Sequence, residues 1–94
     1  MPIPNQPLWL FPTRLTKTGA SVATSREYVT IEADRALLRQ LSWLCDGTRR
    51  LDRIIHRLSD RWSSTGIRRL IGYLAHRGVI VNAYELSSLS LDWL

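Results

Sequence analysis

Arginines carry most of the chemistry available to this sequence. Arg49, Arg53, Arg57 and Arg61 recur every four residues, so a helix over this stretch would place them along one exposed side. A guanidinium group pairs with carboxylates and phosphates through a planar fork of N–H donors. The spacing therefore indicates either a solvated face with local ion pairs or a docking surface for an anionic partner, an acidic peptide or nucleic acid.

The positive charge of the chain is confined to one stretch. The 94 residues include 13 basic and 8 acidic side chains, a net charge of +5. Residues 35–77 hold ten arginines against three aspartates, a net +7. Only one of the 13 bases is a lysine. Selection for an acidic partner would produce this preference for arginine, and so would a genome rich in G and C.

Catalytic and metal-binding patterns are weak. Asp52 and His56 are i, i+4 neighbours that could share a metal, but a solvated helical pair is the simpler interpretation. The five glycines are too scattered for a phosphate loop, and no serine lies in a nucleophile elbow. Cys45, the single cysteine, falls on an apolar helical face, which favours a buried thiol in a reducing compartment. We therefore expect a cytoplasmic protein that is not an enzyme and has no metal or cofactor.

The elements that position these side chains begin with strands. We expect an irregular segment over residues 1–7, an edge strand over 8–17 that Pro12 interrupts, and a turn at 18–20. Two further strands follow over 21–26 and 27–33. In the second, Val29, Ile31 and Ala33 alternate with Tyr28, Thr30 and Glu32, which is typical of a half-buried antiparallel strand.

Helical periodicity begins at Asp34, a good N-cap, and continues to Asp46-Gly47, where the glycine can adopt the left-handed conformation. Leu51, Ile54, Ile55 and Leu58 form the apolar stripe of a second helix. A third helix is expected after the caps Ser63, Ser64 and Thr65, with Gly78 as its end and a short strand over 79–81.

These elements predict an α+β domain over residues 1–83, with a C-terminal tail or linker at 84–94. An N-terminal antiparallel three-stranded sheet would precede a three-helix bundle, whose second and third helices have winged helix-turn-helix-like proportions. The chain has no apolar run of about 18 residues that could span a membrane. Its opening residues also lack the pattern of a secretory signal.

Gly72 interrupts the third helix, where alanine would be more favourable by about 1 kcal/mol. Its missing side chain would let another backbone approach closely. That backbone could belong to a bound peptide or to the domain itself.

Three segments together resemble the PqqD-like family, the RiPP recognition elements. They are Leu44-Cys45-Asp46-Gly47, the Leu-x-x-Ile-x-x-x-Leu pattern of 51–58, and Leu74-x-x-x-Gly78-Val79-Ile80, and the resemblance covers Tyr28 to Val81. The sequence differs from the family's pattern just before and within the second helix, where Arg50 replaces a common Thr and Arg53 a common acid. Thr48 is then the expected cap.

The resemblance implies a peptide-binding protein of bacterial natural product biosynthesis. Such domains bind the leader segment of a ribosomally synthesised precursor peptide and present it to a modifying enzyme such as a cyclodehydratase, a dehydrogenase or a radical enzyme. The leader adds as a strand to the third strand of the sheet and lies against the third helix. The implied peptide-binding residues are Tyr28, Val29, Thr30, Ile31, Glu32, Arg68, Arg69, Ile71, Gly72 and Ala75. Gly72 would permit the close approach, and Arg68 or Arg69 would pair with leader carboxylates.

A winged helix-turn-helix DNA-binding protein is the competing hypothesis. The net +7 of the helical stretch and Arg68, Arg69 and Arg77 on the recognition helix favour it. Glu85 and Asp92 oppose it, since they lie where a DNA-contacting wing would follow Gly78 and would repel phosphate.

Overall fold

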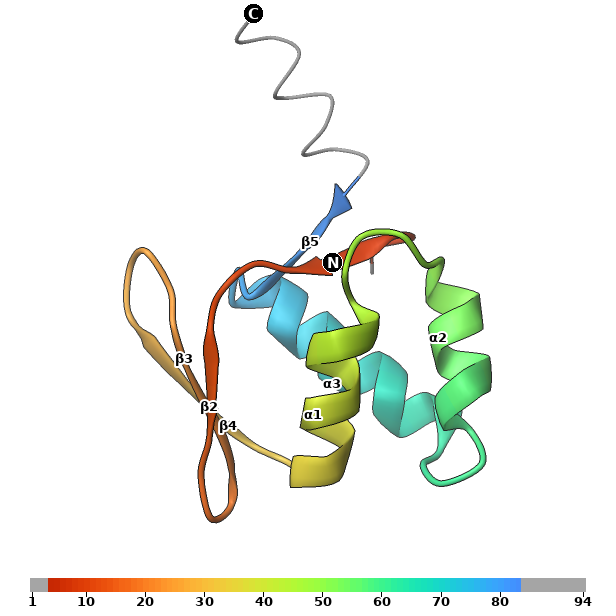
Figure 1. The fold of residues 1–94 in the computed structure, drawn as a ribbon, viewed down its shortest axis with the longest axis horizontal. Coiled ribbons are helices and arrows are strands. Elements are labelled where there is room, and N and C mark those ends of the chain that lie inside the picture. The colour runs from red at the N-terminus through yellow and green to blue at the C-terminus, as the bar shows by residue number, and fades with distance from the viewer. Residues whose placement is uncertain (1–3, 84–94) are drawn as a thin grey trace, which may run out of the picture.

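The structure is a computed structural model that describes residues 4–83. These residues form β1 (Pro7–Trp9), β2 (Thr13–Leu15), β3 (Gly19–Ala23), β4 (Tyr28–Glu32), α1 (Arg35–Leu44), α2 (Leu51–Leu58), α3 (Ser64–His76) and β5 (Ile80–Asn82), as Figure 1 shows. The described part is thus a small α+β domain with a three-stranded antiparallel sheet, β2-β3-β4, and three helices. The predicted tail or linker, residues 84–94, lies outside the described residues.

The predicted single strand over residues 8–17 is wrong, because the chain changes sheets at Pro12. β1 pairs antiparallel with β5, with Leu8 opposite Val81 and Trp9 opposite Ile80, whereas β2 pairs with β3. Proline has no N–H to donate to a ladder, so a break between two strands suits it.

The predicted irregular segment extends one residue too far, since Pro7 is buried at the start of β1. The link between α1 and α2 holds this strand on its other side. The Trp9 N–H donates to Cys45 O (2.7 Å), and the Gly47 N–H donates to Pro7 O (3.1 Å). Gly47 takes the predicted left-handed conformation, with φ +86, and a Cβ there would lie 3.1 Å from the Ala83 Cβ. The Asp46-Gly47 segment therefore packs β1 against the helices.

The three-stranded sheet differs from the prediction at both of its turns. Gly19 and Ala20 belong to β3, and a Cβ on Gly19 would lie 1.8 Å from Ile31 O, so only glycine allows β3 to approach β4 here. The predicted strands 21–26 and 27–33 are separated by a turn in which the Thr24 hydroxyl accepts the Glu27 N–H (3.1 Å). Threonine can close a turn through such local hydrogen bonds, which hydrophobic periodicity does not show.

The predicted helices are present, and two of their caps are confirmed. Asp34 Oδ1 accepts the Ala36 and Leu37 N–H groups at the start of α1, and Ser63 Oγ accepts the Gly66 N–H at the start of α3. The prediction that Thr48 caps α2 is wrong: its hydroxyl donates to Asp46 Oδ1 (2.5 Å) instead. The Leu51 N–H donates to Asn5 O, so the N-terminal segment satisfies this helix end.

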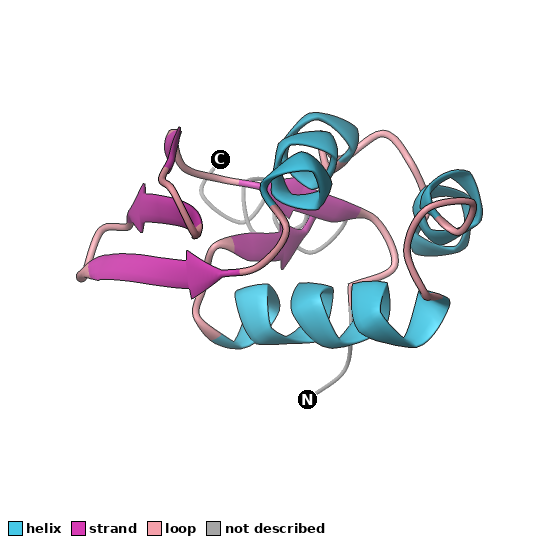
Figure 2. Cartoon of the chain, turned by 90° about the horizontal axis from the view of Figure 1, so that it is seen from below, coloured by secondary structure: helices cyan, strands magenta, loops and turns pink. Residues whose placement is uncertain are grey.

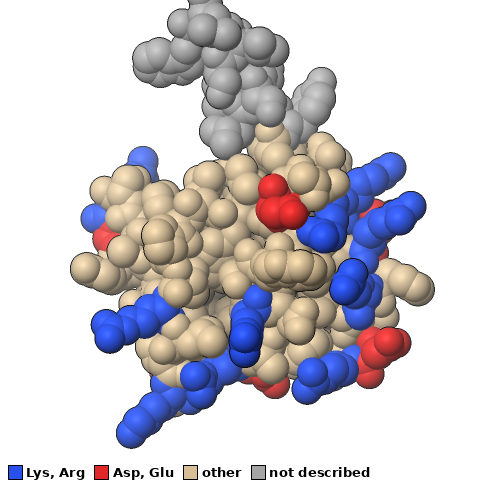
Figure 3. Space-filling model, in the orientation of Figure 1, with Lys and Arg blue, Asp and Glu red and all other residues tan. Residues whose placement is uncertain are grey.

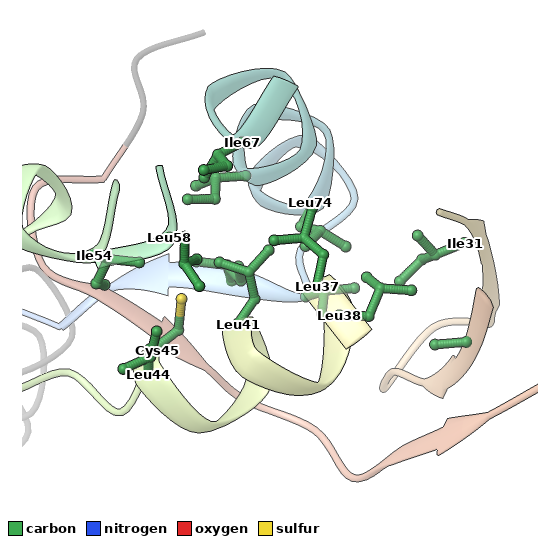
Figure 4. Close-up of a cluster of buried hydrophobic side chains, with 14 of the residues drawn as sticks. Ile31, Leu37, Leu38, Leu41, Leu44, Cys45, Ile54, Leu58, Ile67 and Leu74 are labelled. Atoms are coloured by element: carbon green, nitrogen blue, oxygen red, sulfur yellow. The ribbon is translucent and has the colours of Figure 1, made fainter. Parts of the chain in front are cut away.

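One hydrophobic core joins the helices and the sheet. Figure 4 shows Leu38, Leu41 and Leu44 of α1 directed toward side chains of α2 and α3. Ile31 of β4 extends the same core to the sheet. In Figure 2, α1 and α3 lie in opposite layers, and β4 is the strand of its sheet nearest α3. Among residues 4–83, no helix has the length and apolarity needed to cross a membrane.

Candidate functional site

β4 forms an edge of the three-stranded sheet, and its only strand partner among residues 4–83 is β3. The Thr24 N–H donates to Glu27 O (2.9 Å), so Thr24 and Glu27 stand as a hydrogen-bonded pair in the β3–β4 register. Bonded and non-bonded pairs alternate along an antiparallel ladder, so Val29 and Ile31 bond to β3. The N–H and C=O groups of Tyr28, Thr30 and Glu32 consequently face away from β3.

A groove of about 550 Å³ lies between this edge and α3. We call it the β4 groove; its lining residues are Thr30, Ile31, Glu32, Arg69, Leu70 and Tyr73. Leu70 is partly buried and Tyr73 is exposed, so the helical wall combines apolar surface with one cation, Arg69. Unpaired main-chain groups beside such a wall are the two parts of a site for an extended peptide.

An ion pair joins the same two elements. Arg77, just after α3, donates to Glu27 Oε1 (2.7 Å), just before β4. Both side chains are partly exposed, so the pair adds little to stability. The pair matters more for DNA binding, because Glu27 neutralises Arg77, one of the three arginines on which the DNA-binding hypothesis rests.

The predicted peptide-binding residues separate into four groups. Thr30, Ile31, Glu32 and Arg69 line the β4 groove. Tyr28 lies on the same strand with its side chain 76% exposed. Val29 and Ile71 are 0% exposed in the core, so their side chains are not accessible to a peptide.

The remaining predicted residues, Arg68, Gly72 and Ala75, are not among those that line this groove. Helix geometry explains the difference, because residues four apart share a face and adjacent residues are about 100° apart. Arg68 and Gly72 therefore lie along one flank of α3, and Arg69 and Tyr73 along another. Sequence reasoning missed Leu70 and Tyr73, although the four-residue spacing of Tyr73 from Arg69 places these two on one flank.

A second surface was not anticipated. It is a hollow of about 890 Å³ over α1, which we call the α1 surface. Its lining residues are Leu15, Arg35, Ala36, Arg39, Gln40, Ser42, Trp43 and Arg57. The four-residue spacing of Arg35, Arg39 and Trp43 could have indicated this surface from the sequence, because it places the three side chains on one face of a helix. The predicted series on α2 is shorter than expected, because Arg49 precedes the helix and bonds to Asp46 Oδ2 (2.9 Å).

Two aspartates and one cysteine have shifted pKa values. The Trp62 indole N–H (3.3 Å) and the N–H groups at the start of α1 lower the pKa of Asp34. The hydroxyl and N–H of Thr48 lower that of Asp46. Burial raises the pKa of Cys45 to about 12, so its thiol is protonated at neutral pH. No three His, Cys, Asp or Glu side chains within residues 4–83 are grouped as a metal site would require.

The chain was compared with known families and proteins. A scan of protein-family models finds no match to it, and neither does a search of curated proteins.

Proposed function

We propose that this chain is a peptide-recognition domain of the kind that the PqqD-like resemblance implies. In this proposal a leader peptide adds to β4 as an extra strand, lies in the β4 groove against α3, and is presented in the cytoplasm to a separate or fused modifying enzyme. The chain itself performs no catalysis. Its architecture is that of a winged helix-turn-helix, with α2 and α3 as the helix pair beside the sheet.

The outward main-chain groups of Tyr28, Thr30 and Glu32 beside a groove are the observation that supports this proposal most. Strand addition takes its affinity from such groups and its register from side-chain pockets. Leu70 and Tyr73 offer apolar contact, while Arg69 offers a guanidinium for a leader carboxylate. The two kinds of contact together suit an extended peptide with apolar and acidic side chains.

The strand register identifies a substitution that tests strand addition at β4 specifically. Proline at Thr30 removes one outward N–H but leaves the N–H groups of Val29 and Ile31, which pair with β3. Proline is tolerated at such edge positions. Leu15→Pro is the matched control, because Leu15 and Ala20 form a non-bonded pair and the change removes an outward N–H from the opposite edge, β2.

The test is a fluorescence titration with the N-terminal segment of a short precursor peptide encoded beside this chain. We expect Thr30→Pro to weaken binding at least about tenfold, which corresponds to about 1.4 kcal/mol. Leu15→Pro should leave the affinity within about twofold of the original. Equal affinities of Thr30→Pro and the unchanged protein would refute strand addition at β4.

DNA binding is the alternative function, and the exposure of Arg68 and Arg69 on α3 favours it. A mobility shift with random duplex DNA at two salt concentrations distinguishes the two functions, since phosphate contacts give a steep salt dependence. Tight, salt-sensitive binding of duplex, together with no precursor peptide or modifying enzyme among the neighbouring genes, would establish the alternative.

A further inference from the structure

The α1 surface has three walls from different parts of the chain. Arg35, Arg39 and Trp43 follow one another at four-residue intervals along α1. Leu15 of β2 borders this stripe, and so does Arg57 of α2. Trp43 is 61% exposed and Leu15 is 37% exposed, so the hollow offers apolar contact between its charges.

The charges of this hollow are not neutralised within the described part of the chain. Arg35, Arg39 and Arg57 have no Asp or Glu oxygen within 4.0 Å among residues 4–83, and no acidic residue lines the hollow. In Figure 3, Lys and Arg side chains follow the lower and right-hand margins of this face. Like charges one turn apart on a helix repel each other, so an anionic partner would relieve a local cost.

The contacts of Trp43 favour a partner with carboxylates over one with nucleobases. The guanidinium carbons of Arg49 and Arg57 lie 5.2 Å and 5.9 Å from the centroid of its ring. A guanidinium stacked on an indole still presents its N–H edges, which bind carboxylates in pairs. A nucleobase, in contrast, would have to compete with these guanidiniums for the ring.

We propose that the α1 surface docks an acidic segment of a partner protein, with carboxylates on Arg35, Arg39 and Arg57 and an apolar side chain between Leu15 and Trp43. This surface is separate from the β4 groove, since α1 and α3 lie in opposite layers (Figure 2). The domain would then hold two partners at once. The proposal does not depend on which peptide, if any, binds at β4.

The experiment uses the full chain and two probes, a fluorescein-labelled peptide of repeated Glu-Glu-Leu units and single-stranded oligo-dT. Binding is followed by fluorescence polarisation in the unchanged protein and in Arg39→Glu, Arg39→Gln and Trp43→Ala. Arg26→Glu is the matched control, because it changes the net charge equally at an exposed turn outside both surfaces. Circular dichroism verifies that each variant is folded.

We expect Arg39→Glu to weaken binding of the acidic peptide about tenfold, since it places like charges together. Arg39→Gln and Trp43→Ala should weaken it less, and Arg26→Glu should change it by less than about twofold. If Arg26→Glu lost as much affinity for the acidic peptide as Arg39→Glu, net charge alone would explain the effect and the proposal would be overturned. Tighter binding of oligo-dT than of the peptide, an unchanged affinity in Trp43→Ala, or no binding by the original protein would also overturn it.

Discussion

The β4 groove and the α1 surface offer a partner different kinds of contact from opposite layers of one small domain. The groove presents main-chain groups of a strand edge, with Arg69 facing a groove that also contains Glu32. The α1 surface presents mainly side chains, because all but one of its lining residues lie on helices, whose main chain is already hydrogen-bonded within itself. Its arginines have no acid beside them in the hollow. The first site therefore recognises mainly an extended backbone and the second recognises mainly charge.

The largest expected effect comes from a substitution in the hydrophobic core that supports both regions. Leu41 of α1 is 0% exposed in the core, so Leu41→Ala should lower the free energy of unfolding by about 2–5 kcal/mol. Urea denaturation followed by circular dichroism measures the change. Binding at both regions should weaken together. A variant that lost one and kept the other would show that they do not depend on a common core.

Gly19→Ala should damage the β4 side alone. The new Cβ would meet the carbonyl of Ile31, so β3 and β4 must shift apart, at about 1–3 kcal/mol for such overpacking. Hydrogen exchange should become faster at the Val29 and Ile31 amides, which bond to β3. Unchanged exchange at these amides would contradict the close approach of the two strands.

Salt should separate the two proposed interactions. Raising the ionic strength from about 0.05 M to about 0.5 M should weaken an acidic peptide at the α1 surface about tenfold or more, because these exposed charges become screened. Strand addition at β4 should change far less, since most of its contacts are neutral hydrogen bonds and Arg69 is the one cation that lines the groove. Equal salt dependence at the two sites would contradict the view that one recognises mainly main-chain groups and the other mainly charge.

The smallest effect concerns Asp34, which caps α1 and accepts the Trp62 indole N–H. Its pKa is lowered from the ordinary value of 3.8, so the folded state favours the carboxylate. The stability that this carboxylate contributes is complete above pH 3.8 and is lost as the pH falls through the lower folded-state pKa. Urea titrations across this range should show a smaller acid loss in Asp34→Asn than in the unchanged protein. Identical pH profiles would mean that the cap does not depend on charge.

Local signals were sufficient for the helices and insufficient for the sheets. Asp34, Ser63 and Gly47 act where their residue types predict, because caps and left-handed glycines depend on a few neighbouring residues. The pairing of β1 with β5 joins residues far apart in sequence, and no periodicity contains that information.

The candidate site shows the same limit. The alternation around Val29 and Ile31 identified β4 and its buried face correctly. Which flank of α3 faces β4 depends on the rotation of the helix about its own axis. The apolar stripe in the sequence determines this rotation only within a broad range of angles. Sequence reasoning therefore grouped Arg68 with Arg69, although only Arg69 lines the groove.

The β1–β5 pair also sets an order for folding. Trp9 meets Ile80 only after the intervening sheet and helices exist, since closing so long a loop costs more entropy than forming contacts within a hairpin or helix pair. We expect β2-β3-β4 and the helices to assemble first, with β1 docking last. On the ribosome, β1 would emerge before β5, and its apolar side chains would stay open to other chains until β5 follows.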